Sequence, residues 1–244
     1  MWESGNQEIV GRSRLASGAA ELCAPVMKWR PPAVLLLPLL AACRHGSVPE
    51  ALVWKLERAD EIGGVRTEVG GAPKLLAAAE GGPGLWFDGA GDGLWLPVNP
   101  IEGRASFTIE ILIRPEAGGP AEQRYFHVED AAGRRGLLEL RMVGADAWCL
   151  DTFLKDGVVS LPLLDRTKTH PAGRWTWVAL RYDGRAMSAW VDGVKEREGD
   201  VAIAPMGAGR VSLGTRQDKR SWFRGAIREV RISAEALPPE RMQH

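Results

Sequence analysis

The sequence predicts an all-β fold in which two antiparallel sheets pack face to face. Residues 106–114 alternate apolar and polar side chains with a period of two, which is typical of a half-buried strand. Other short apolar segments recur between turn residues, and the chain holds 29 glycines and 16 prolines to build those turns. No long helical pattern alternates with the strands, so a parallel α/β sheet is excluded.

The expected strands follow one another at the spacing of a sandwich. Residues 85–89 and 93–97 flank a Gly-Ala-Gly-Asp turn, and Asp-Gly pairs bracket the strand around Trp190. Residues 63–84 are rich in turns and contain one ambiguous apolar run, and only residues 234–242 suggest a turn of helix. The expected strands are 52–56, 85–89, 93–97, 106–114, 124–128, 137–142, 147–154, 175–182, 187–191, 210–213 and 226–233.

Composition and charge limit the class of partner. Hydrophobic residues make up 45% of the chain and charged residues 25%, which is typical of a packed globular domain. Basic and acidic residues number 31 each, and without residues 1–42 the counts are 27 and 28. A nearly neutral domain lacks the clustered basic face that a phosphate backbone requires, so nucleic acid is excluded as a partner.

Residues 27–43 have the order of an export signal. Lys28 and Arg30 precede an apolar segment at 33–40, which is too short to span a bilayer because spanning takes about 20 apolar residues. The following Leu-Ala-Ala-Cys resembles the bacterial lipobox, in which the cysteine is lipid-modified and becomes the new N-terminus. We expect a lipoprotein signal peptide at 27–42, lipidation of Cys43 and a tether at 43–51. An unlipidated signal peptide is the alternative.

The residues around this signal predict where the chain starts and where it is delivered. Residues 1–26 are polar and without periodicity, so we expect a wrongly assigned leader and translation from Met27. The destination is the cell envelope. Arg44 stands where inner-membrane lipoproteins carry Asp, so the outer membrane or cell surface is favoured over the inner membrane. Cys149 is then the one free thiol of the mature domain, and we expect it to be a buried packing residue.

Five motifs follow one another in the chain. They are Leu-Trp-Phe-Asp-Gly at 85–89, Phe-Thr-Ile-Glu-Ile-Leu-Ile-Arg-Pro at 107–115, Trp-Thr-Trp-Val-Ala-Leu-Arg-Tyr-Asp-Gly at 175–184, Trp-Val-Asp-Gly at 190–193 and Trp-Phe-Arg-Gly-Ala-Ile-Arg-Glu-Val-Arg-Ile at 222–232. In this order they resemble the LamG-like (laminin G type 3) jelly-roll family, within the concanavalin A-like lectin/glucanase superfamily. The resemblance covers about residues 52–240. It implies a two-sheet jelly roll with one concave sheet, and functions dominated by binding of glycans or proteins.

The last motif departs from the family at a position that bears on metal binding. Relatives often carry Asp where this chain has Arg228, and that Asp can contribute to a structural calcium. A cation cannot ligate a hard divalent ion, so Arg228 disfavours calcium. Asp88 and Asp92 have oxygens to offer, but Asp beside Gly is typical of a turn. No second histidine stands at metal-ligand spacing, so no zinc site and no other cofactor are expected.

Catalytic patterns are missing from the sequence, which favours a binding module over an enzyme. Glycosidases of the superfamily carry Glu-x-Asp-x-x-Glu on one strand, and this chain has no such pattern. Polar residues opposite the apolar strand faces remain, and they either share a ligand groove or form a solvated, salt-bridged face. In the groove, Trp148 would be a stacking platform for a sugar ring. The candidate ligand-binding residues are Arg124, His127, Glu139, Arg141, Trp148 and Asp151.

The sequence therefore predicts a lipid-anchored, extracytoplasmic module that binds a glycan or an envelope protein without catalysis. Two alternatives remain open. One is a divergent glycan hydrolase or lyase that uses residues such as Glu139, Arg141 and Asp151. The other is a structural accessory of an envelope assembly. Two carboxylates about 5 to 9 Å apart in a groove would favour the hydrolase, whereas a shallow salt-bridged face would favour interaction.

Overall fold

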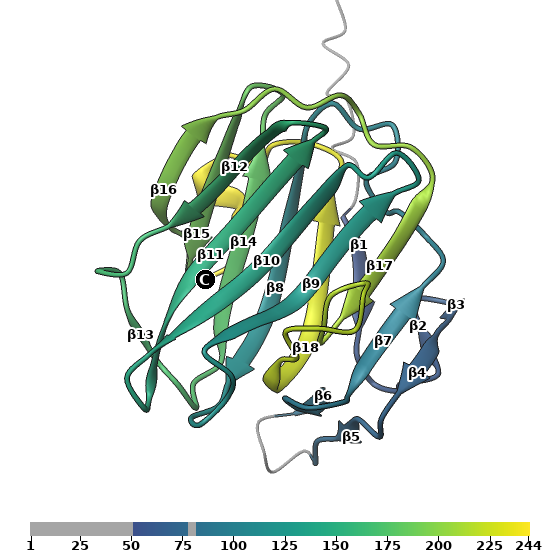
Figure 1. Ribbon diagram of the computed structural model, residues 1–244, viewed down its shortest axis with the longest axis vertical. Coiled ribbons are helices and arrows are strands. Elements are labelled where there is room, and N and C mark those ends of the chain that lie inside the picture. The colour runs from purple at the N-terminus through teal and green to yellow at the C-terminus, as the bar shows by residue number, and fades with distance from the viewer. Residues whose placement is uncertain (1–50, 78–81) are drawn as a thin grey trace, which may run out of the picture. The chain divides into compact units, whose positions relative to one another are not determined.

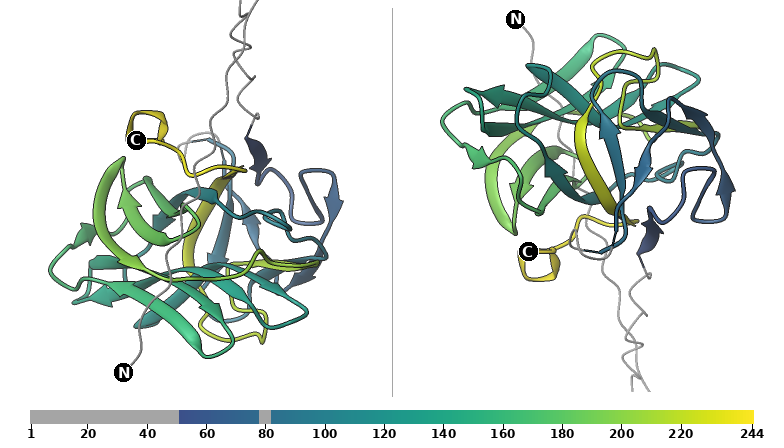
Figure 2. Two further views of the ribbon diagram at one scale, coloured as in Figure 1. Left: turned by 90° about the horizontal axis from the view of Figure 1, so that it is seen from above. Right: turned by 90° about the horizontal axis from the view of Figure 1, so that it is seen from below.

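A computed structural model describes residues 51–77 and 82–244, which contain two large sheets that lie face to face (Figures 1 and 2). Across the first, the β8 sheet, the strands are β16 (Val194–Asp200), β15 (Ala186–Val191), β14 (Thr176–Tyr182), β8 (Phe107–Pro115), β18 (Arg224–Ser233), β6 (Leu85–Asp88) and β5 (Lys74–Leu75), and β1 (Leu52–Lys55) also pairs with β18. Across the second, the β10 sheet, they are β12 (Val159–Leu164), β11 (Ala147–Asp156), β10 (Arg135–Val143), β9 (Glu122–Asp130), β17 (Gly209–Leu213), β7 (Gly93–Leu96) and β4 (Glu68–Gly70), with β13 (His170–Pro171) beside β11.

Both sheets join strands that are far apart in the sequence. Strand β18 lies between β8 and β6, and β17 lies between β9 and β7 (Figure 1). Every strand pair among the described residues is antiparallel, including the small separate pair β2 (Glu61–Ile62) and β3 (Val65–Arg66). The predicted two-sheet antiparallel sandwich is confirmed.

The core fills the space between the sheets. On β8 the apolar side chains of Phe107, Ile109, Ile111 and Ile113 point into this core and are at most 1% exposed. The strand is not half-buried along its whole length as predicted, because Thr108 and Glu110 on the other face are also buried. The strands at the far ends of the two sheets, β16 and β12, were not predicted from the sequence. Most of their side chains are exposed or half-buried, so they lack the apolar alternation that marks a strand with one buried face.

A glycine at the start of β18 allows two strands to approach closely. Gly225 has φ +146°, and a Cβ there would lie 2.4 Å from the carbonyl oxygen of Arg114 and 2.9 Å from the Cα of Pro115. The glycine of the sequence Phe223-x-Gly225 therefore stands where only a residue without a side chain fits between the two backbones. A larger residue at this position would separate β18 from β8.

Residues 234–244 cover part of the outer face of the β8 sheet. Leu237 and Met242 pack with Ala179 and Trp190 in a small apolar cluster. The backbone N–H of Gln243 donates to Glu110 Oε1 at 2.7 Å. The segment contains the short 3₁₀ helix η2 (Pro239–Arg241), so the expected turn of helix exists but is shorter than residues 234–242.

The predictions about export concern residues that the structure does not describe. The leader, the signal peptide, Cys43 and the tether up to residue 50 all lie outside the described residues. Within residues 51–77 and 82–244, no helix combines the length and the apolar character needed to cross a membrane. Cys149 is among the described residues, and it is buried and free, as expected. Burial raises the pKa of its thiol.

Candidate functional site

A hollow of about 220 Å³ lies on the outer face of the β10 sheet, and we call it the β10 hollow. Most of its lining comes from β9, β10 and β11, and one residue comes from the loop 214–223. The lining combines charged side chains with a small apolar area. It consists of Arg124, Arg135, Leu137, Glu139, Arg141, Asp151, Phe153, Pro162 and Arg216.

Strand alternation places four of these side chains on one face. Side chains two residues apart on a strand share a face, so Glu139 lies beside Leu137 on β10 and Asp151 beside Phe153 on β11. The register sets Glu139 directly opposite Asp151 and Leu137 opposite Phe153. Directly opposed side chains have Cβ atoms about 5 Å apart, so the two carboxylates are neighbours.

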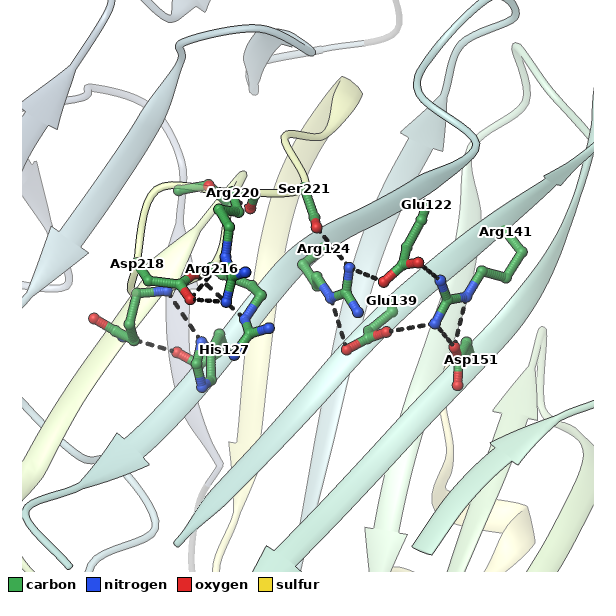
Figure 3. Close-up of polar contacts among 12 residues, drawn as sticks. Glu122, Arg124, His127, Glu139, Arg141, Asp151, Arg216, Asp218, Arg220 and Ser221 are labelled. Atoms are coloured by element: carbon green, nitrogen blue, oxygen red, sulfur yellow. Dashed lines mark hydrogen bonds and ion pairs between the residues drawn. The ribbon is translucent and has the colours of Figure 1, made fainter. Parts of the chain in front are cut away.

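A β-bulge in β9 brings Arg124 to the same face. Glu139 pairs with Arg124 and Leu138 pairs with Phe126, so Tyr125 is an extra residue without a partner on β10. Tyr125 and Phe126 therefore both point into the core, and both are fully buried. Arg124 and His127, three positions apart, consequently lie on the outer side of the sheet together (Figure 3).

The carboxylates of the hollow are held by two arginines (Figure 3). Arg141 Nη2 lies 3.3 Å from Glu139 Oε2 and 2.6 Å from Asp151 Oδ2, and Arg141 Nε donates to the same Asp151 oxygen at 2.8 Å. Arg124 Nε lies 2.9 Å from Glu139 Oε1. Glu122, at the end of β9, forms ion pairs with both arginines and is the most exposed member of this network.

Burial changes the protonation of this network. Burial is the main cause of the raised pKa of Glu139, which is about 7. The positive charge of Arg124 lowers this pKa, and the negative charge of Asp151 raises it. Burial also raises the pKa of Asp151, although Arg141 opposes it. At Glu122 the two guanidinium groups outweigh partial burial and lower the pKa. The Glu139–Asp151 pair therefore retains a proton at pH values where free carboxyl groups have lost theirs.

The other side of the hollow is formed by Arg135, Phe153 and Arg216. The guanidinium of Arg135 lies over the Phe153 ring, 5.7 Å from its centroid. Arg216 Nε lies 3.4 Å from Asp218 Oδ1, and Asp218 also binds Arg220 (Figure 3). Leu137 and Pro162 complete the apolar part of the lining.

His127 lies beside the hollow and positions the loop next to it. It is fully buried, its Nδ1 accepts a hydrogen bond from the backbone N–H of Gln217 at 3.1 Å, and its Nε2 lies 3.3 Å from Glu129 Oε2. Burial lowers its pKa, so the ring is neutral at physiological pH. Of the predicted residues, Arg124, Glu139, Arg141 and Asp151 line the hollow, and His127 supports it.

The prediction for Trp148 is wrong. Its side chain is fully buried in the core, its Nε1 donates to the carbonyl oxygen of Pro171 at 3.2 Å, and its ring packs 4.8 Å from the ring of His170. The reason is strand alternation, because Trp148 is an odd number of residues from Asp151 and so faces the opposite side of β11. The aromatic residue on the hollow is Phe153, which the same parity could have identified.

The residues considered for calcium have other functions in the structure. Asp88 Oδ1 accepts three backbone hydrogen bonds, from Ala90, Gly91 and Asp92, which is the geometry of a turn. Arg228 is the extra residue of a bulge in β18, and its guanidinium lies 4.2 Å from the ring centroid of Trp175. Across residues 51–77 and 82–244, no three His, Cys, Asp or Glu side chains come together as a metal site.

A comparison with known families places the fold. The family described as "Concanavalin A-like lectin/glucanases superfamily", of laminin G type 3, matches residues 88–243, which is more than half of the chain. The chain belongs to this superfamily. No curated protein matches it.

Solved structures with similar folds include domains of carbohydrate-active and toxin proteins. Domain 4 of AbnA, a GH43 extracellular arabinanase from Geobacillus stearothermophilus in complex with arabinotriose, has a TM-score of 0.56 and 20% identity over 79% of this chain and 97% of that one. The Botulinum neurotoxin serotype D ligand binding domain in complex with N-acetylneuraminic acid has a TM-score of 0.58 and 12% identity, over 78% and 48%. The binding domain of Paraclostridial Mosquitocidal Protein 1 has a TM-score of 0.58 and 12% identity, over 78% and 50%.

These similarities concern the fold alone. This chain spans about half the length of the two toxin domains. The superfamily contains hydrolases as well as binding modules, so the role of the β10 hollow has to be argued from its own residues.

Proposed function

We propose that this chain is a glycan-binding module without catalysis, and that the β10 hollow is its binding site. The observation that carries the proposal is the lining of the hollow, where Phe153, Leu137 and Pro162 form an apolar area beside fixed charged groups. Sugar rings have apolar faces that pack on such side chains and hydroxyl groups that bond to such charges. The similar folds of domains solved with arabinotriose and N-acetylneuraminic acid support this class of ligand.

The position of Arg141 argues against hydrolysis. A glycosidase places the scissile bond between its two carboxyl groups, which must be free to act as acid and as base or nucleophile. Here Arg141 Nη2 contacts both Glu139 and Asp151, so a guanidinium already lies where the substrate would be cleaved. The arrangement resembles the shallow, salt-bridged face that favours interaction.

The experiment is a glycan array with the protein and with Phe153→Ala. We expect one class of glycan to bind, and Phe153→Ala to weaken that binding about ten-fold by removal of the stacking surface. Trp86→Ala is the matched control, since Trp86 lies on the β8 sheet with the Arg224 guanidinium 5.9 Å from its ring centroid. Equal loss in both variants, or binding only to a protein partner, would contradict the proposal.

Hydrolysis is the second candidate, favoured by the adjacent carboxyl groups and the raised pKa of Glu139. Release of reducing ends from the bound glycan tests it. Turnover that Glu139→Gln abolishes would replace the binding module with an enzyme. We expect no turnover by the wild-type protein.

We further propose that the module is lipid-anchored in the cell envelope through Cys43, at the outer membrane or cell surface. The lipobox-like sequence at 40–43 and Arg44 behind it support this location. The test is metabolic labelling with a palmitate analogue followed by membrane fractionation. Cys43→Ala should lose the label and leave the membrane fraction, whereas Cys149→Ala should keep both. Label that persists in Cys43→Ala would refute the anchor.

A further inference from the structure

The β10 hollow has an excess of positive charge. Four arginines and two carboxylates line it. Arg124 and Arg141 are neutralised by Glu139, Asp151 and the neighbouring Glu122. Carboxylates compensate the charges of Arg135 and Arg216 much more weakly, so the excess positive charge lies on the side of the hollow that also carries Phe153.

Arg135 makes no close ion pair. Across the described part of the chain, no Asp or Glu oxygen lies within 4.0 Å of its guanidinium nitrogens, and its guanidinium lies over the Phe153 ring. Glu129, which is opposite Arg135 on β9, interacts with this charge at longer range, while its carboxylate contacts His127. The Nε of Arg135 is buried and has no hydrogen-bond acceptor. A buried donor without a partner is unfavourable, and more so when it is charged.

Arg216 shares its one carboxylate. Asp218 forms ion pairs with both Arg216 and Arg220, and Arg216 Nε makes no hydrogen bond. Burial lowers the pKa of Arg216, and the nearby cations of Arg124, Arg135 and Arg220 lower it further, although Asp218 opposes them. The cations on this side of the hollow therefore repel one another, and an anion between them would remove that repulsion.

The loop that carries Arg216 is held in place before any ligand binds. Lys219 and Ser221 have φ values of +58° and +56°, in the left-handed region that non-glycine residues seldom adopt. Arg124 Nη1 donates to Ser221 Oγ at 2.6 Å, and the backbone N–H of Arg216 donates to the carbonyl oxygen of Arg220 at 3.1 Å. A fixed loop lowers the ordering cost of binding.

From this arrangement we infer that the β10 hollow selects glycans that carry an anionic group, a carboxylate or a sulfate, and that Arg135 and Arg216 bind that group. The inference rests on the proposed glycan-binding function. Guanidinium groups suit both anions because their planar N–H donors match two oxygens at once. Phe153, beneath Arg135, would contact the sugar ring to which the anionic group is attached.

The test compares acidic oligosaccharides with neutral counterparts by calorimetric titration of the full chain. The carboxylate pairs are oligogalacturonate with its methyl ester and 3′-sialyllactose with lactose, and the sulfate pair is 3′-sulfolactose with lactose. We expect at least one acidic member to bind at least ten-fold more tightly than its neutral counterpart, and the preference to weaken with added salt.

The variants Arg135→Gln and Arg216→Gln should each reduce that preference about ten-fold, because each should weaken binding of the acidic member more than binding of its neutral counterpart. Arg185→Gln is the control, because it removes the same charge from an exposed arginine that pairs with Asp200 on the β8 sheet. If Arg135→Gln does not fold, Arg135→Lys takes its place. It keeps the positive charge but loses the planar pair of N–H donors, so it should retain only part of the preference.

The outcomes separate the inference from the function on which it rests. Equal binding of acidic and neutral members, or a preference that survives in both Gln variants, would overturn the inference and leave the glycan-binding module standing. Absence of binding to every member of all pairs, and to a wider array, would overturn the function as well.

Discussion

The outer faces of the two sheets differ in what covers them. On the β8 sheet, residues 234–244 lie over the strands, Leu237 and Met242 pack on Trp190, and a backbone N–H bonds to the carboxylate of Glu110. On the β10 sheet the corresponding carboxylates, Glu139 and Asp151, are bound by arginine side chains around a hollow.

The two outer faces stabilise a buried carboxylate in different ways. Glu110, like Glu139, is at most 4% exposed, and burial raises its pKa. A backbone donor and an apolar cover stabilise Glu110, whereas guanidinium groups of side chains compensate Glu139. Side chains can exchange partners when a ligand arrives, whereas a packed segment cannot without unfolding locally. The β10 face is therefore the one suited to binding.

The largest expected effect concerns which face of β11 belongs to the core. Trp148→Ala should lower the free energy of unfolding by about 3–5 kcal/mol, because it removes a fully buried aromatic side chain. Phe153→Ala should cost much less, since its side chain is only half-buried. Denaturant melts of both variants check this. Similar losses of stability would contradict the assignment of the two aromatics to opposite faces.

The second expected effect concerns the pH dependence of the β10 face. The raised pKa of Glu139 means that the folded protein keeps a proton that the unfolded chain loses. Its stabilising contribution is complete below the unfolded pKa of about 4.5 and is lost as pH rises to about 7, by up to about 3 kcal/mol. Urea melts between these pH values should show this fall, and Glu139→Gln should reduce it. An unchanged slope in the variant would reject the assignment.

A smaller effect is expected on the covered face. Leu237→Ala should destabilise the protein by about 2 kcal/mol, at the low end for a buried leucine because its cluster contains only four residues. Hydrogen exchange at the Gln243 amide should become faster as the cover loosens. Glycan binding should not change. A loss of binding in this variant would show that the two faces are coupled.

The smallest effect is expected at an exposed ion pair. Arg185→Gln breaks the contact with Asp200, where both side chains are mostly exposed, and should change stability by less than about 0.5 kcal/mol. Arg141→Gln, which removes the shared partner of Glu139 and Asp151, should cost several times more. Thermal melts of the two variants compare them. Equal effects would mean that the β10 network behaves as ordinary surface charge.

Much of the fold could be predicted because it depends on local pattern. The period of two at 106–114 identified β8 and its buried face, and the Asp-Gly pairs identified turns. The edge strands β12 and β16 could not be identified, because a strand with few buried side chains has no apolar signal. Five of the six candidate residues lie at or beside the hollow. Glu139, Arg141 and Asp151 could be predicted together, because alternation on the paired strands β10 and β11 puts all three on one face.

The remainder of the site depends on information that is not local. Simple alternation would place Arg124 and His127 on opposite faces, and only the bulge at Tyr125 reconciles them. Arg216 reaches the hollow from a loop about ninety positions further along the chain, through the contacts of Gln217 with His127 and Ser221 with Arg124. The prediction for Trp148 was wrong because it rested on the residue type and not on the strand face that position 148 occupies.

The bulge at Tyr125 also has a genetic consequence. Loss of this one codon would leave Arg124 and His127 two positions apart, and regular alternation would keep both on the outer face with Arg124 still opposite Glu139. The loss would remove the fully buried Tyr125 side chain, so it would disturb the packing of the core and not the charged face. Related sequences that are one residue shorter here should therefore still place an arginine opposite Glu139.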